Sequence, residues 1–120
     1  MPVRAIRGAT QLSADDAAEM SDAVVELLQL ILERNELAVD DVISVVFTAT
    51  ADLVSGFPAA PARLIGFGDI PLLCAAELSI PGALPRVIRV MMHVNIDRPR
   101  DQVQHVYVRG AEALRQDLAQ

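Results

Sequence analysis

The stretch that decides the fold runs from Ser13 to Thr50, SADDAAEMSDAVVELLQLILERNELAVDDVISVVFTAT, and predicts a helix followed by a strand. Its first part repeats apolar residues at spacings of three and four beside an acidic stripe, which is the pattern of an amphipathic helix. Ser13 with Asp16 three positions later resembles a helix start, and Asn35, which tolerates a left-handed cap, marks the predicted end. The run Val42–Thr50 is rich in β-branched residues and continuous, as expected for a strand buried on both faces.

Further strands and one short helix lie on either side of this stretch. Residues 3–9 predict a first strand, and Phe57-Pro58 opens a short helix that Gly66 and Gly68 end. The remaining strands are expected at 70–75, 87–94 and 103–108, with a turn at Pro81-Gly82 and a terminal turn or helix at 110–118. The predicted fold class is therefore α+β, a five-stranded mixed sheet with two helices on one side.

The length of 120 residues suits a single domain over residues 1–120. The apolar fraction is 52%, above the ordinary range of about 45–50%, so some apolar surface is expected to be covered by another subunit. A net charge of −6 and only four aromatic residues argue against a nucleic-acid partner. Cys74 is the only cysteine, so no internal disulfide can form. No apolar run has the length of a signal peptide or membrane span, which predicts a cytoplasmic protein without membrane contact.

Arg89 lies in an apolar strand, VIRVMM over 87–92. All 10 basic residues are arginine, which genome composition can explain, so the position of an arginine is more informative than the count. The neighbours of Arg89 are apolar on both strand faces, and an unpaired charge in a buried strand would cost several kcal/mol. Arg89 is therefore expected either to meet an anion, from a ligand or a protein carboxylate, or to reach water at a strand end.

Glu77 and Arg7 lie at the ends of two other predicted strands. Glu77 follows an apolar run and can either pair with Arg89 or be solvated. Arg7 precedes Gly8 and has the same ambiguity. On residue types alone, the function of these charged groups stays open.

Other chemistries find little support in the chain. Catalysis by Cys74 would need a base, and the only histidines, His93 and His105, are more often surface or packed residues. No pair of residues has the spacing of metal ligands. Gly66-Phe67-Gly68 lacks the third glycine and the strand-to-helix setting of a dinucleotide loop.

Six blocks of sequence occur in an order and spacing that point to one family. They are Arg4–Thr10, Thr48–Leu53 followed by Phe57–Ala59, Pro71–Cys74 with Glu77, Arg86–Val90, His105–Tyr107 and Leu114-Arg115. Together they span nearly the whole chain and resemble the monofunctional, AroH-type chorismate mutases. The resemblance implies that the protein isomerises chorismate to prephenate by a non-covalent pericyclic rearrangement in aromatic amino-acid biosynthesis, with no cofactor and no metal.

The same resemblance implies a trimeric pseudo-barrel with an active site between each pair of adjacent subunits. It assigns catalytic positions to Arg7, Glu77 and Arg89. The positions that it implies for substrate binding are Phe57, Arg63, Leu73, Cys74, Ala75, Ala76, Tyr107, Leu114 and Arg115.

Two parts of the implied site lie outside the strands. Phe57 and Arg63 would come from the facing subunit, and residues 110–120 would form a mobile tail near the mouth of the pocket. The family often has a basic residue two positions after Pro58, where this chain has Ala60. That departure removes a possible carboxylate contact and places more weight on Arg63 or Arg115.

Two other functions remain open at this point. A non-catalytic sensor could use the same arginines to hold a carboxylate metabolite, and Ala60 is compatible with that. A trimeric enzyme that hydrolyses imines or enamines could also place an arginine in an intersubunit cleft. Glu77 and Tyr107 at the mutase spacing argue against the second alternative.

Overall fold

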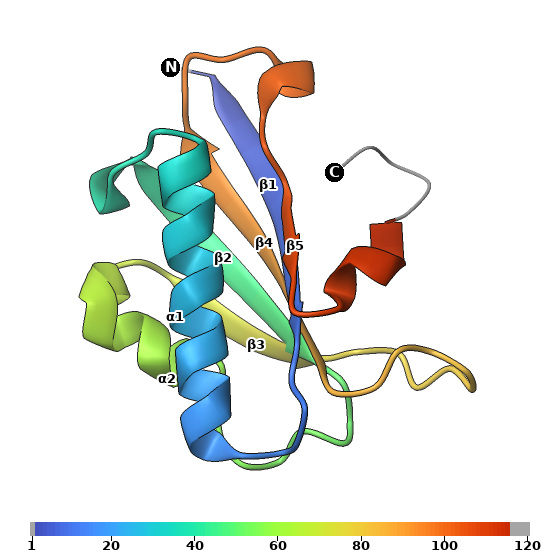
Figure 1. Cartoon of the computed structure of the whole chain (residues 1–120). Coiled ribbons are helices and arrows are strands. Elements are labelled where there is room, and N and C mark those ends of the chain that lie inside the picture. Colours follow the sequence, from blue (N-terminus) through green and yellow to red (C-terminus); the bar gives the residue numbers. More distant parts are fainter. Residues whose placement is uncertain (1, 116–120) are drawn as a thin grey trace.

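A computed structural model describes residues 2–115 and contains one mixed sheet covered by helices on one face. The strands are β1 (Val3–Gln11), β2 (Val42–Ala49), β3 (Leu72–Ala76), β4 (Val87–Asn95) and β5 (Val106–Val108), in the spatial order β3-β2-β4-β1-β5. The helices are α1 (Ala17–Arg34), α2 (Ala59–Ala62), which continues into the wider turn η2 (Arg63–Phe67), and the single turns η1 (Val39–Asp41), η3 (Arg100–Gln102) and η4 (Ala111–Arg115). The five-stranded mixed sheet with two helices on one side is as predicted, and Figure 1 shows α1 and α2 on the same face of it.

The pairing of the strands explains how residues far apart in the chain meet. β4 is antiparallel to both β1 and β2, whereas β5 runs parallel to β1 and β3 runs parallel to β2. β4 therefore lies at the centre of the sheet, and β3 and β5 form its two edges. Within residues 2–115, no helix is long and apolar enough to cross a membrane.

α1 ends at the predicted place, with Asn35 as its C-cap, but both of its caps differ in detail from the sequence prediction. The N-cap is Asp16, whose carboxylate accepts the Glu19 N–H at 2.8 Å, and Ser13 instead donates its N–H and hydroxyl to the Glu19 carboxylate. Asn35 is the C-cap at φ −105°, so the predicted left-handed cap is wrong at this residue. Its buried side chain is bonded to the backbone of Ile31 and Gln104, which ties the helix end to the loop before β5.

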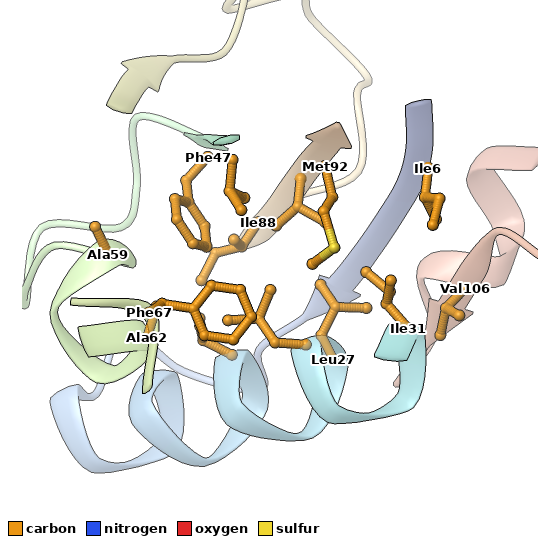
Figure 2. Close-up of a cluster of buried hydrophobic side chains, with 14 of the residues drawn as sticks. Ile6, Leu27, Ile31, Phe47, Ala59, Ala62, Phe67, Ile88, Met92 and Val106 are labelled. Atoms are coloured by element: carbon orange, nitrogen blue, oxygen red, sulfur yellow. The ribbon is translucent and has the colours of Figure 1, made fainter. Parts of the chain in front are cut away.

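The hydrophobic core lies between α1 and the sheet. Figure 2 shows Leu27 and Ile31 of α1 pointing toward Met92 and Ile6 of the sheet, and all four are fully buried. At Gly8 the helix approaches β1 so closely that an added Cβ would lie 2.9 Å from Cδ1 of Ile31. The missing side chain thus lets the helix lie directly against the strand that carries Arg7.

The other face of the sheet, here called the uncovered face, is open except at one end, where η4 and Leu84 pack over Ala9, Val87 and Tyr107. β4 alternates from residue to residue, with Val90 and Met92 buried but Arg89 and Met91 exposed. β2 also leaves alternate residues partly exposed, among them Val46. The prediction that these strands are buried on both faces is therefore wrong for most of their length in the single chain, because only the end at Val87 is covered on the second face.

The boundaries of other elements also differ from the prediction, among them β1 and β3, which are observed at Val3–Gln11 and Leu72–Ala76. β5 spans only Val106–Val108 instead of 103–108, because residues 100–102 form the turn η3 and the chain joins β1 only at Val106. Pro58 is the N-cap of α2 rather than its first residue, and Gly66 ends the regular helical backbone with φ at +99°. The terminal segment forms η4 up to Arg115, and the rest of the predicted mobile tail, 116–120, lies outside the described residues.

Candidate active site

A cavity of about 220 Å³ opens on the uncovered face of the sheet. Its walls are built by β1, β2, β4, β5 and the residue that follows β3. The lining residues are Arg7, Gly8, Val46, Thr48, Glu77, Arg89, Val90, Met91 and Tyr107. All three predicted catalytic residues and Tyr107 are in this set, so the fold brings together positions that span 100 residues of sequence.

Strand register accounts for this convergence. Paired residues on neighbouring strands point to the same face of a sheet, so one row of pairs forms a continuous strip of side chains. One such row crosses the uncovered face through Ala75, Thr48, Arg89, Ala9 and Tyr107. The next row contains Leu73, Val46, Met91 and Arg7. Arg89 therefore lies at the middle of the sheet with the other polar groups of the pocket around it.

Arg89 is paired with Glu77. Nε of Arg89 lies 3.3 Å from Oε2 of Glu77, and the two side chains are 45% and 18% exposed. Thr48 Oγ1 also donates to the Glu77 carboxylate, and the Glu77 N–H donates to Ala49 O at 3.0 Å, which extends the pairing of β2 with the chain after β3. Of the two alternatives for Glu77, the pair with Arg89 is the one observed. The ion pair uses Nε of Arg89, which leaves the two terminal nitrogens of the guanidinium available to a ligand.

Arg7 and Tyr107 form the opposite wall of the pocket. The Arg7 N–H donates to Nδ1 of His105 at 2.9 Å. Tyr107 packs in a small buried cluster with Ala9, Val87 and Ala111. The predicted substrate contact Leu114 packs against this cluster from η4 and is not among the lining residues, so in the single chain it supports Tyr107.

The predicted β3 contacts are divided between the two faces of the sheet. Cys74 pairs with the buried Phe47 and packs against the hydrophobic core, on the face opposite Arg89. Leu73 and Ala75 lie on the uncovered face, and Leu73 is 61% exposed beside Val46. None of Leu73, Cys74, Ala75 and Ala76 lines the cavity of the single chain.

The two residues expected from a facing subunit lie away from the cavity. Phe57 is 74% exposed and lines a separate hollow with Met20 and Leu64 between α1 and α2. Arg63 is exposed at the start of η2. Neither can complete the pocket of its own chain, because both belong to the helical layer on the other side of the sheet. Arg115 is the last described residue, and the predicted contact of its side chain lies outside what the structure describes.

Sequence reasoning missed Thr48, Val46 and Met91 as pocket residues. Each of these residues alternates with buried neighbours along its own strand, with the period of two of a β-strand. That the residues of β2 and β4 lie on the same face follows only from the strand register, in which Thr48 pairs with Arg89 and Val46 pairs with Met91. Val42–Thr50 reads as one continuous run rich in β-branched residues, so the alternation carries little signal without the register. In the part of the chain that the structure describes, no group of three or more His, Cys, Asp or Glu side chains could hold a metal ion.

Comparisons with known proteins agree with this geometry. The sequence profile of the family "Chorismate mutase type I" matches residues 3–118. The chain is 48% identical over 117 residues to chorismate mutase AroH of Thermus thermophilus, which covers 97% of this chain and 96% of that protein. It is 40% identical over 120 residues to chorismate mutase AroH of Bacillus subtilis (strain 168), with coverage of 99% and 94%.

A solved structure shares the fold as well as the sequence. The chorismate mutase from Clostridium thermocellum has a TM-score of 0.89 and 45% identity to this chain, and the match covers 91% of this chain and 97% of that one. The profile match and these relatives extend over nearly the full length of the chain, including the strands that build the pocket. The chain belongs to the type I chorismate mutase family.

Proposed function

We propose that this protein is a chorismate mutase, an isomerase that converts chorismate to prephenate in aromatic amino-acid biosynthesis. The observation that carries the proposal is the pair of Arg89 and Glu77 in one open pocket with Arg7 and Tyr107. The relatives that share this fold at 40–48% identity are named for the same activity. Membership of a biosynthetic enzyme family also supports a cytoplasmic location.

The reaction suits a pocket made of hydrogen-bond donors. In this rearrangement an ether C–O bond breaks while a C–C bond forms within one molecule, so no nucleophile and no external proton transfer take part. The protein must hold the substrate in the diaxial conformer in which the two reacting carbons meet, and fixing such geometry lowers part of the barrier. Arg7 and Tyr107, on adjacent strands, are placed to anchor carboxylate groups of the substrate.

Arg89 and Glu77 supply the electrostatic part. As the C–O bond stretches, negative charge develops on the ether oxygen and positive charge on the ring. A terminal nitrogen of Arg89 donates to that oxygen, while Glu77 accepts from the ring hydroxyl and faces the positive fragment. The ion pair and the bond from Thr48 orient both groups before the substrate arrives, and a preorganised donor of this kind contributes roughly 2.7–4 kcal/mol.

The pocket is completed by a second copy of the chain in a homotrimer. Two features support this part of the proposal. Most of the sheet face is open, with Arg89, Met91 and Leu73 exposed on it, and the other side of the chain exposes Val54, Phe57 and Leu64, which are 80%, 74% and 84% exposed. Docking the α2 region of one chain over the open sheet of the next would bury apolar surface on both. It would also place Phe57 and Arg63 over the pocket of the neighbour.

The ultraviolet absorbance of chorismate gives the direct test of the activity. Prompt loss of chorismate absorbance with formation of prephenate is expected. Binding of chorismate without turnover would instead identify a sensor of carboxylate metabolites and would refute the enzyme.

Mixing two inactive variants tests the shared site. Arg89→Ala and Arg63→Ala are each expected to lower activity, but after unfolding and refolding together one site in about four would combine an intact Arg89 with an intact Arg63 from the next subunit. Recovery of about a quarter of wild-type activity would follow. Absence of any recovery, with trimers present by light scattering, would contradict a site built from two chains.

A further inference from the structure

The imidazole of His105 is bonded to the backbone of Arg7, and none of the roles described above uses it. Nδ1 of His105 accepts the Arg7 N–H at 2.9 Å, between residues 98 positions apart in the chain. We propose that His105 is a positioning residue that holds the Arg7 and Tyr107 wall of the pocket in place, and that it does so only as the neutral imidazole. The inference rests on the proposed mutase activity and deepens it by naming what sets the geometry of the anchoring residues.

The bond between Arg7 and His105 lies at the end of the short pairing of β1 with β5. β5 has only three residues and forms an edge of the sheet, and its pairing with β1 begins at Gly8 with Val106. Arg7 and His105 are each one residue before that first pair. The imidazole therefore takes the place that a backbone carbonyl would have in a longer strand, and it extends the connection between β1 and β5 by one bond.

The same bond secures both anchoring residues. Arg7 is held through its own backbone, and Tyr107 lies two residues after His105 on the strand that the bond attaches. His105 lies on the pocket side of the sheet, because it lines a hollow together with Arg7 and Met91, which belong to that face. Loss of the bond would free the start of β5 and the Arg7 end of β1 together, and would change the distance between the two anchors.

The protonation state of His105 decides whether the bond can exist. Nδ1 accepts only when it carries no proton, so the neutral ring must hold its proton on Nε2. His105 lines a second hollow of about 520 Å³ whose other charged or titratable lining residues are Arg4, Arg7, Arg100 and His93. A protonated imidazole would turn a donor toward the Arg7 N–H and add positive charge beside three guanidinium groups. Acid is therefore expected to break the bond.

The variants that test this are His105→Asn, His105→Leu and the matched control His93→Leu. Oδ1 of asparagine is as many bonds from the backbone as Nδ1 of histidine, so it can accept the same N–H but cannot titrate. Leucine fills similar space without an acceptor. His93 lines the same hollow and is the only other histidine of the chain, so a general effect of losing an imidazole there would appear in the control.

The expected kinetic result separates binding from turnover. At pH 8, His105→Leu should raise KM roughly five- to tenfold, about the effect of one neutral hydrogen bond, and change kcat less. His105→Asn should restore KM to within about twofold of the wild-type value. It should also lack the decrease in kcat/KM that the wild type and His93→Leu are both expected to show as the pH falls from about 8 to about 5. A normal KM in His105→Leu, or an acid limb that persists in His105→Asn, would overturn the proposal.

A measurement without substrate keeps this test independent of the enzyme assignment. The backbone amide of Arg7 in nitrogen-15 NMR spectra should move as His105 titrates in the wild type, and should not move over that range in His105→Asn. Failure of the wild type to convert chorismate would refute the proposed function alone. An Arg7 amide that ignores the titration of His105 would refute the positioning role, whatever the activity.

Discussion

Replacing Arg89 by alanine is expected to cost little stability. Its side chain is 45% exposed on the open face of the sheet, and its ion pair with Glu77 spans 3.3 Å. In water two unit charges at that distance attract by about 1.3 kcal/mol, and measured exposed pairs contribute only about 0.2–1 kcal/mol. Glu77 would keep its bond from Thr48. The free energy of unfolding should therefore fall by no more than about 1 kcal/mol.

The same replacement is expected to cost most of the activity. Arg89 would no longer donate to the ether oxygen, and loss of one preorganised donor lowers kcat about 10²- to 10³-fold. Arg89→Lys should also be poor, because an ammonium cannot keep the contact with Glu77 and reach the substrate with the same planar geometry. Progress curves of chorismate absorbance give kcat, and thermal unfolding of the same samples gives the stability.

Arg109 provides a matched control for this prediction. Its Nε lies 2.9 Å from Oε1 of Glu26, with side chains that are 33% and 42% exposed, and neither residue lines the pocket. Arg109→Ala should lose a comparable ion pair and keep kcat. Near-normal turnover in Arg89→Ala would remove Arg89 from the mechanism. A large loss of stability in Arg89→Ala but not in Arg109→Ala would show that the activity was lost through unfolding.

Three further predictions follow from contacts elsewhere in the fold. Gly8→Ala should lower the free energy of unfolding by about 1–3 kcal/mol, because the added Cβ would lie 2.9 Å from Cδ1 of Ile31. Thermal or urea denaturation measures this loss, and unchanged stability would show that α1 can move away from β1 at no cost. Cys74→Ser should retain substantial kcat, because the thiol faces the core and takes no covalent part, whereas complete loss in a folded variant would revive nucleophilic chemistry. Bonds from the Ser13 N–H and hydroxyl hold the pKa of Glu19 below its usual value, so their stabilisation is present at neutral pH and is lost as pH falls through that lowered pKa. Glu19→Gln should therefore show less loss of stability in acid unfolding than the wild type, and an equal loss would contradict the assignment.

The order of elements could be predicted because each carries its own local signal. The spacing of apolar residues in α1 and the glycine and proline positions around α2 depend on neighbours in the chain alone. Burial of β2 and β4 was predicted wrongly for the opposite reason. A continuous apolar run has the same appearance whether its second face is covered or open, and here residues 2–115 cover that face only near Val87.

From residue types alone, the site could be predicted only where a charged residue interrupts an apolar segment. Arg89 stands out among apolar neighbours, and the structure decides between the two alternatives that the sequence left open for Glu77 in favour of a pair with Arg89. Thr48 was missed because its place beside Arg89 depends on strand register, which no local pattern records. Cys74 shows the reverse case: it lies in a matching block of sequence, yet its pairing with Phe47 turns the thiol toward the core.

The charges in the pocket support the proposed site between two chains. Of its lining residues, Arg7 and Arg89 are positive and Glu77 is negative, so the described walls carry a net charge of about +1. Chorismate brings two carboxylates, and Glu77 must stay charged and paired for Arg89 to be held in position. The described walls of the pocket thus carry one positive charge fewer than the two negative charges of the substrate. Ala60 cannot supply it, and in the proposed trimer the missing charge would come from the exposed Arg63 of a neighbouring chain or from Arg115.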